Sequence, residues 1–166
     1  GAVTAGSLRE KKKETLPAGH SLTVQEAEEG VGCFLEIRCD TVLDHMDQLL
    51  PQKGEYIPVN GVILERVRVN FEQGETAFEL LQRVCNETGI PLEYSFTPLY
   101  NSYYIEGINH LYEFDCGSRS GWMYQVNEEF PAYGASSYII QPEDVITWHY
   151  TCQGLGEDVG AKILEE

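Results

Sequence analysis

Positive charge is scarce in this 166-residue chain, which carries 11 Lys and Arg against 27 Asp and Glu, for a formal net charge of -16. This excess of acid disfavours nucleic acid and anionic membrane surfaces as partners, because both attract cationic side chains. The chain also lacks any apolar run near the roughly 20 residues that a membrane-spanning helix needs. We therefore expect no membrane-spanning segment, and many carboxylates are free to meet a cation.

Closely spaced cysteines are missing as well. No CxxC pair indicates a structural zinc site. Single, spread-out cysteines favour disulfides with one cysteine left over, which is typical of an oxidising, extracellular compartment. The alternative is a set of buried thiols, because free cysteine is a common core residue. The five cysteines are Cys33, Cys39, Cys85, Cys116 and Cys152.

Sequence motifs of catalysis are absent too. None of the four histidines stands in an HExxH motif, and the chain has no GxSxG or Walker sequence. His149 alternates with Trp148 and Tyr150 in a predicted strand, which favours a packed residue over a general base. A Cys–His pair stays open, since such pairs form in space and not in sequence. We expect a protein that is not an enzyme, with a hydrolase as the least favoured alternative.

The chain divides by composition into two parts. Residues 1–30 are polar, with a basic run followed by acids, and indicate a linker or arm. Order is predicted from residue 32, where Cys33, Leu35, Ile37 and Cys39 alternate as in a strand. We therefore expect an N-terminal linker or arm over 1–30 and a binding domain over 31–166.

Helical and strand patterns in the second part predict its fold class. Apolar spacing over 42–50 predicts a short helix that ends before Pro51, and a stronger stripe predicts a helix over Glu75–Thr88 that is stopped by Gly89. The order of elements predicts an α+β fold: a β-grasp-like mixed sheet with one main helix packed across it. Further strands are predicted over 62–64, 67–71, 92–96, 122–126 and 145–152.

The β-grasp arrangement bears on the cysteines, because its first and last strands are parallel neighbours. Both strands are predicted to end in cysteine, at Cys39 and Cys152. We therefore predict a Cys39–Cys152 disulfide. A second predicted disulfide joins Cys85 to Cys116 and leaves Cys33 free.

A set of aspartates predicts a metal site. Asp40, Asp44 and Asp47 recur at i, i+4 and i+7 on one face of the predicted short helix, where like charges repel unless a cation lies among them. A Cys39–Cys152 bond would bring Asp158 beside Asp40. Oxygen ligands suit calcium, or magnesium in a tighter site. We predict a divalent metal ion, calcium favoured, at Asp40, Asp44, Asp47 and Asp158. A solvated acidic face, with Asp40 as the helix N-cap, is the alternative.

Tyrosine is abundant, with ten residues, most of them between 94 and 138. Tyrosine and tryptophan give rigid contact area at low entropic cost, so a surface strip of them would suit a flat organic ligand, a sugar ring or a protein partner. Trp122 also fits a core position. The predicted ligand-binding residues are Tyr100, Tyr103, Tyr104, Tyr112 and Trp122.

The segment Ser120–Asn127, SGWMYQVN, followed by Pro131, Gly134 and the run DVITW at 144–148, resembles the C-terminal domain of transcobalamin and intrinsic factor. The likeness is closer to the small secreted bacterial domains that share this signature. It spans about residues 32–160 and includes RCDTVLD at 38–44, YNSYYIEGIN at 100–109 and DVG at 158–160.

This resemblance implies a β-grasp fold of the soluble-ligand-binding type and an extracellular location, often on the surface of Gram-positive bacteria. The sequence departs from the family pattern at two turns. Glu128 stands where glycine usually follows Val-Asn, and the usual Asp-Gly-Asp turn before the last strand reads Pro142-Glu143-Asp144.

Together these patterns predict an extracellular, bacterial cell-surface binding domain that is not catalytic. It would hold a divalent cation, calcium favoured, and bind a small organic ligand through its aromatic face. The alternative is an adhesive or structural module that contacts a surface protein or glycan without metal.

Overall fold

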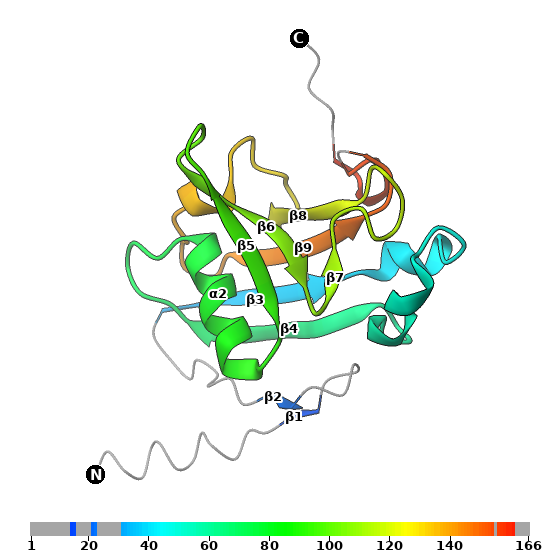
Figure 1. Cartoon of the computed structure of the whole chain (residues 1–166). Coiled ribbons are helices and arrows are strands. Elements are labelled where there is room, and N and C mark those ends of the chain that lie inside the picture. Colours follow the sequence, from blue (N-terminus) through cyan, green and yellow to red (C-terminus); the bar gives the residue numbers. More distant parts are fainter. Residues whose placement is uncertain (1–13, 16–20, 23–30, 155, 162–166) are drawn as a thin grey trace.

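The computed structural model of the chain describes residues 14–15, 21–22, 31–154 and 156–161 (Figure 1). Of the predicted linker over 1–30, the described part is a pair of two-residue strands, β1 (Glu14–Thr15) and β2 (Ser21–Leu22), which run antiparallel. The rest of that linker lies outside the described residues. The proposed boundary between arm and domain therefore stays a prediction.

A four-stranded mixed sheet forms the base of the domain, in the order β4-β3-β9-β8. Strands β3 and β9 are parallel neighbours, whereas β4 and β8 pair antiparallel with them. This is the predicted pairing of the first and last strands. The four strands are β3 (Gly32–Arg38), β4 (Val62–Asn70), β8 (Gly121–Val126) and β9 (Val145–Thr151).

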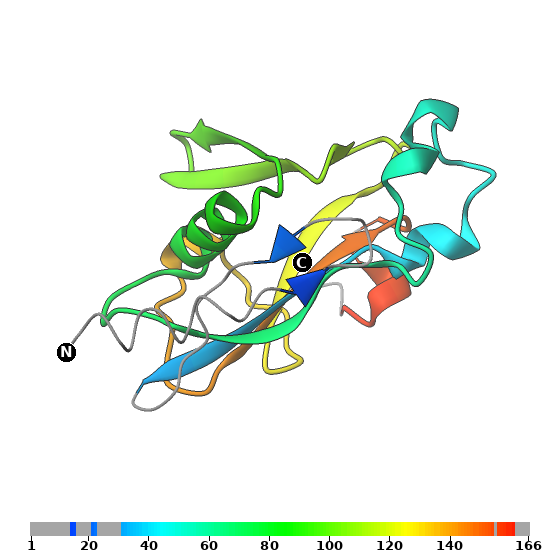
Figure 2. The same ribbon diagram turned by 90° about the horizontal axis from the view of Figure 1, so that it is seen from below.

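A second layer covers one face of this sheet. Figure 2 shows helix α2 and strands β5 and β6 on the same side of the four-stranded sheet. The predicted α+β, β-grasp-like arrangement, with one main helix packed across a mixed sheet, is confirmed. The covering elements are α2 (Ala77–Thr88), β5 (Leu92–Thr97), β6 (Ser102–Ile108) and β7 (Leu111–Tyr112).

The core lies between the two layers and follows the period of two that strands impose on their side chains. On β3, Cys33, Leu35 and Ile37 are fully buried, as their alternation predicts. Side chains from α2 and from β8 and β9 complete the core. These include Leu80, Leu81 and Val84 of α2, Trp122, Tyr124 and Val126 of β8, and Ile146, Trp148 and Tyr150 of β9.

Helix α2 begins two residues later than predicted because Thr76 caps it. The Thr76 hydroxyl accepts the backbone N–H of Glu79, and the Glu79 carboxylate accepts the backbone N–H of Thr76, which is a complete capping box. The helix ends at Gly89, whose φ of 78° is the left-handed conformation that glycine adopts without strain.

The predicted helix over 42–50 is wrong. The chain instead forms a 3-10 helix, η1 (Asp40–Asp44), then turns, and then a second 3-10 helix, η2 (Pro51–Tyr56). The backbone N–H of Leu50 donates to the carbonyl of Asp115, a residue far along the chain, so it does not extend a local helix. The two strands predicted over 62–71 are one strand, β4, whose register against β3 shifts between Leu35 and Ile37 and again between Ile37 and Arg38.

Neither predicted disulfide is present, because all five cysteines are free and buried. The register of β3 against β9 ends with Arg38 opposite His149. Cys39 is one residue past Arg38, whereas Cys152 is three residues past His149, which is an offset of two residues or about 6.6 Å in extended chain. The Cys152 thiol instead donates to the Thr41 hydroxyl at 3.8 Å, and the thiol of Cys116, the predicted partner of Cys85, donates to the backbone carbonyl of His45 at 3.4 Å. Burial raises the pKa of Cys33, Cys39 and Cys85 to about 12 in each case.

Two further 3-10 helices are η3 (Ala135–Ser137) and η4 (Glu157–Val159). Across the described residues, no helix has the length and apolar character needed to cross a membrane.

Candidate ligand-binding site

A cavity of about 520 Å³, here called the aromatic pocket, opens between strand β6 and the loop that follows β8. Ring side chains form most of its wall. Small or uncharged polar residues, among them Ser102, Gly134 and Ser137, complete it. Its ring residues are Tyr100, Tyr103, Tyr104, Tyr124, Phe130 and Tyr133.

The loop after β8 is tied to β6 and to β8 itself. The backbone N–H of Tyr103 donates to the Ser136 hydroxyl at 3.0 Å, and the Tyr124 hydroxyl donates to the carbonyl of Tyr133 at 2.8 Å. Gly134 approaches β6 so closely that a Cβ there would stand 2.6 Å from the Ser102 hydroxyl oxygen. The two walls of the aromatic pocket are therefore held together by hydrogen bonds and by the absence of a side chain at position 134.

The aromatic pocket carries no charge on its wall. The Tyr104 hydroxyl donates to Glu113 at 2.7 Å, and burial together with this hydrogen bond raises the pKa of Tyr104 to about 12. Burial also raises the pKa of Tyr124. Both tyrosines are neutral at physiological pH. Three other cavities, of about 760, 520 and 550 Å³, all have charged side chains in their walls.

Three of the five predicted ligand-binding residues, Tyr100, Tyr103 and Tyr104, meet in the aromatic pocket. The other two do not line it. Trp122 is 7% exposed and donates its Nε1–H to the carbonyl of Leu111 at 2.9 Å, which is a core role. The Tyr112 ring lies elsewhere, with the Lys53 ammonium 4.8 Å from its centroid.

The opposite wall of the aromatic pocket was not among the predicted site residues. Tyr124, Phe130 and Tyr133 carry the same aromatic signal as the predicted tyrosines. Nothing in their spacing shows that the chain folds back to face β6. Their place in the wall depends on the loop contacts described above.

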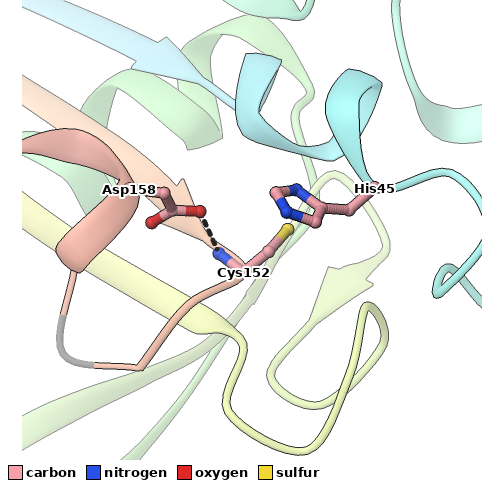
Figure 3. Close-up of side chains that lie close together, drawn as sticks. All are labelled: His45, Cys152 and Asp158. Atoms are coloured by element: carbon pink, nitrogen blue, oxygen red, sulfur yellow. Dashed lines mark hydrogen bonds between the residues drawn. The ribbon is translucent and has the colours of Figure 1, made fainter.

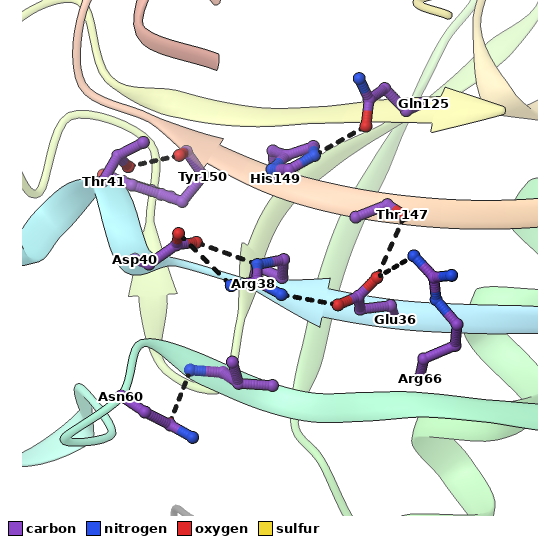
Figure 4. Close-up of polar contacts among 11 residues, drawn as sticks. Glu36, Arg38, Asp40, Thr41, Asn60, Arg66, Gln125, Thr147, His149 and Tyr150 are labelled. Atoms are coloured by element: carbon purple, nitrogen blue, oxygen red, sulfur yellow. Dashed lines mark hydrogen bonds and ion pairs between the residues drawn. The ribbon is translucent and has the colours of Figure 1, made fainter. Parts of the chain in front are cut away.

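The face of the four-stranded sheet opposite helix α2 holds a charged network (Figure 4). The buried Glu36 carboxylate accepts from Arg38 at 2.7 Å and from Arg66 at 3.2 Å, and Arg38 also pairs with Asp40 at 3.2 Å. His149 lies beside this network on β9, with its Nε2 2.8 Å from the Gln125 side-chain oxygen. Burial lowers the pKa of His149. Arginine therefore balances these carboxylates without a metal ion.

The four aspartates of the predicted calcium site do not form a group of adjacent ligands. Asp40 and Asp44 are the two ends of η1, a 3-10 helix with three residues per turn, so the i, i+4 spacing does not place them on one face, and Asp47 lies beyond η1. Asp158 accepts hydrogen bonds from the Thr151 hydroxyl and, at 2.8 Å, from the backbone N–H of Cys152. Calcium at these residues stays a prediction that the arrangement of the four aspartates does not support.

A different group of potential ligands is close together (Figure 3). His45, Cys152 and Asp158 each offer a ligand atom, and these atoms all lie within 4.8 Å of one another. Of the predicted metal ligands, it contains Asp158 alone. Sequence spacing gave no sign of the group, because its members come from the two ends of the domain.

Comparisons with known proteins give limited matches. Residues 74–152 match a family described as "Domain of unknown function (DUF4430)". No curated protein matches the chain. Among solved structures, the chain is similar to haptocorrin in complex with Cbi, at 14% sequence identity and a TM-score of 0.48. That alignment covers 76% of this chain and 26% of the haptocorrin chain, so this chain spans about a quarter of that protein. Membership of the transcobalamin group stays a prediction.

Proposed function

We propose that the chain is a binding domain, not an enzyme, and that its aromatic pocket takes a small, planar organic molecule without negative charge. The observation that carries this proposal is an uncharged, ring-walled cavity of about 520 Å³ in a chain of net charge -16. Pockets for small organic ligands are commonly about 300–1,000 Å³ and mostly apolar, with a few polar groups that fix orientation.

Packing around Tyr103 supports a preformed site. The ring of Phe78, on α2, stacks on Tyr103 with centroids 4.7 Å apart and planes 4° from parallel. Phe96 packs against the same ring edge-on at 5.2 Å. A ring that is fixed before the ligand arrives loses little side-chain entropy on binding.

The charge of the whole protein sets the expected preference among ligands. A net charge of -16 repels anions from the molecule, whereas ring faces attract cations. Among planar molecules of one size, we expect a cation to bind more tightly than a neutral molecule, and an anion to bind most weakly.

The test uses three bicyclic probes of similar shape: 1-methylquinolinium, 2-naphthol and 2-naphthalenesulfonate. Each is titrated into ¹⁵N-labelled protein, and the backbone amide shifts give affinity and location. We expect shifts centred on β6 and on residues 130–137. Tyr100→Ala and Tyr133→Ala should each weaken binding about tenfold, which is about 1.4 kcal/mol. Phe114→Ala is the matched control, because Phe114 is 61% exposed and does not line the aromatic pocket.

Equal weakening by all three variants, or shifts that avoid the pocket, would count against the proposal. The alternative function is an adhesive module that contacts a protein or glycan. The exposed apolar residues at the tip of the β5–β6 hairpin favour it, since Leu99 is 81% and Tyr100 74% exposed. Saturable binding of an oligosaccharide such as cellohexaose, without binding of the bicyclic probes, would support that alternative.

A further inference from the structure

His45, Cys152 and Asp158 lie together beyond the carboxyl ends of β3 and β9. His45 follows η1, Cys152 follows β9, and Asp158 belongs to η4. In Figure 3 the His45 ring and the Cys152 thiol point toward each other, with the Asp158 carboxylate close by. None of the three lines the aromatic pocket, so the group has no part in the proposed function.

The His45 ring is held in one tautomer. Its Nδ1 lies 3.0 Å from the backbone carbonyl oxygen of Thr41, which can only accept a hydrogen bond, so Nδ1 carries the proton. The lone pair is then on Nε2, where it accepts a hydrogen bond from the side-chain amide of Gln153 at 3.2 Å, which a bound metal ion would replace. Metal-bound histidines are oriented in this way, with the second ring nitrogen donating to a carbonyl or carboxylate.

The Asp158 carboxylate is also oriented before any ion arrives. The Thr151 hydroxyl donates to one of its oxygens and the backbone N–H of Cys152 to the other. A carboxylate oxygen has two lone pairs, so each oxygen keeps one that can bind a cation. The backbone contact also couples Asp158 directly to the residue that supplies the thiol.

The Cys152 side chain is 6% exposed, and its thiol donates to the Thr41 hydroxyl at 3.8 Å. Burial raises the pKa of Cys152, so without a nearby cation it stays a protonated thiol. This disfavours a catalytic Cys–His pair, in which the cysteine pKa is lowered. A catalytic triad would also need Asp158 to contact His45 Nδ1, but Asp158 accepts from the backbone of Cys152 and His45 Nδ1 contacts Thr41. A substrate would need a cavity here, but none of the four cavities described above is lined by these three residues.

We propose that His45 Nε2, Cys152 Sγ and an Asp158 oxygen bind one zinc ion, with water as the fourth ligand. A nitrogen, a sulfur and an oxygen form a mixed ligand set that suits zinc and not calcium, which prefers oxygen alone. A tetrahedral zinc ion would hold these atoms about 3.3–3.8 Å apart. The group within 4.8 Å needs a contraction of about 1.5 Å at most, within the reach of side-chain rotation.

The test substitutes cobalt(II) for zinc, because cobalt reports its ligands through colour. The full chain, reduced and stripped of metal with a chelator, is titrated with Co²⁺. We expect one equivalent to bind, with visible bands of a tetrahedral ion and a near-ultraviolet band from a single thiolate, and zinc should displace it. Cys152→Ser should abolish the thiolate band. Loss of a residue that only hydrogen-bonds to a metal ligand typically weakens metal binding by about 10- to 100-fold. His45→Gln removes a ligand itself, so it should weaken cobalt binding by more than that.

Cys116→Ser is the matched control. It removes the thiol next to Cys152 and prevents any disulfide between the two, yet it should leave the cobalt spectrum and stoichiometry unchanged. Near-ultraviolet circular dichroism shows that each variant is folded. His45→Gln, at a half-buried position, keeps the test valid if a cysteine variant unfolds.

Three results would overturn the zinc site. The first is wild-type protein with five titratable thiols that binds no cobalt. The second is protein purified without reductant that has three titratable thiols, a Cys116–Cys152 disulfide by peptide mapping, and no metal binding after reduction. The third is a thiolate band that survives Cys152→Ser and disappears in Cys116→Ser. Each result leaves the aromatic pocket and its own test unaffected.

Discussion

The aromatic pocket and the His45–Cys152–Asp158 group share no residue, and they are built in different ways. The pocket is large and uncharged, and its walls come from one stretch of chain, residues 97–137. The group is small and polar, and it joins His45 to two residues that follow the last strand. Local composition can therefore indicate the first site, whereas only the pairing of distant segments creates the second.

We expect the buried carboxylate of Asp144, near the aromatic pocket, to contribute more to the free energy of unfolding than Asp158 does in the His45–Cys152–Asp158 group. Asp144 is 5% exposed and accepts hydrogen bonds from Asn127 at 2.8 Å, from Tyr138 at 2.6 Å and from the backbone N–H of Gln141 at 2.8 Å. Asp144→Ala leaves these donors without a partner, so we expect the free energy of unfolding to fall by about 3 kcal/mol. Urea denaturation followed by tryptophan fluorescence measures this.

The same substitution at the other site should cost less. Asp158 also accepts two hydrogen bonds, but it is only partly buried and water can replace it. We expect Asp158→Ala to lower the free energy of unfolding by about 1 kcal/mol in the absence of metal. If Asp144→Ala and Asp158→Ala lowered the free energy of unfolding equally, the two sites would not differ in how much their carboxylates stabilise the protein.

Two turns of the chain should be strained, one at Asn127 and Glu128 and one at Glu143. Asn127 and Glu128 form a two-residue turn with φ of 52° and 74°, and Val126 and Glu129 exchange both backbone hydrogen bonds across it. Both positions favour glycine, because a residue with Cβ costs about 1–2 kcal/mol in the left-handed region. Glu128→Gly should therefore stabilise the protein by about 1 kcal/mol, measured as a higher urea midpoint.

Glu143, in the second turn, has a φ of 67°, and its replacement by glycine should stabilise the protein less. Its carboxylate pairs with Arg68, and a partly exposed ion pair of this kind contributes about 0–1 kcal/mol. We expect Glu143→Gly to stabilise the protein by about half as much as Glu128→Gly. A larger gain from Glu143→Gly would mean that the ion pair contributes nothing.

The smallest expected effect concerns pH and the face of the sheet opposite helix α2. Burial lowers the pKa of His149, so between its folded and unfolded pKa values the unfolded chain binds more protons. The stabilising contribution of neutral His149 is complete above the unfolded pKa of about 6.5, and it is lost as the pH falls through the folded pKa. His149→Gln should remove this part of the loss. Unfolding free energies at pH 7.5 and 5.5, compared with wild type, test it.

Several predictions from the sequence depended on long-range geometry, and only some of them are confirmed. The parallel pairing of β3 and β9 is confirmed, but a disulfide also needs the register, and two residues of offset separate Cys39 from Cys152. The helix over 42–50 has the right apolar spacing, yet Asp115 takes the hydrogen bond that would have extended it. The extracellular location rested partly on disulfides and now stands as a prediction from the family resemblance alone.

The sequence by itself determined the alternation that buries one face of each strand, the capped helix α2 and the supply of tyrosines. These are local properties, since side-chain direction follows from the backbone period and capping from neighbours three residues apart. Only the tertiary structure decided which tyrosines face a cavity, which cysteines stay apart, and that His45 meets Cys152 and Asp158. Those contacts depend on strand register and loop path, which no spacing along the chain records.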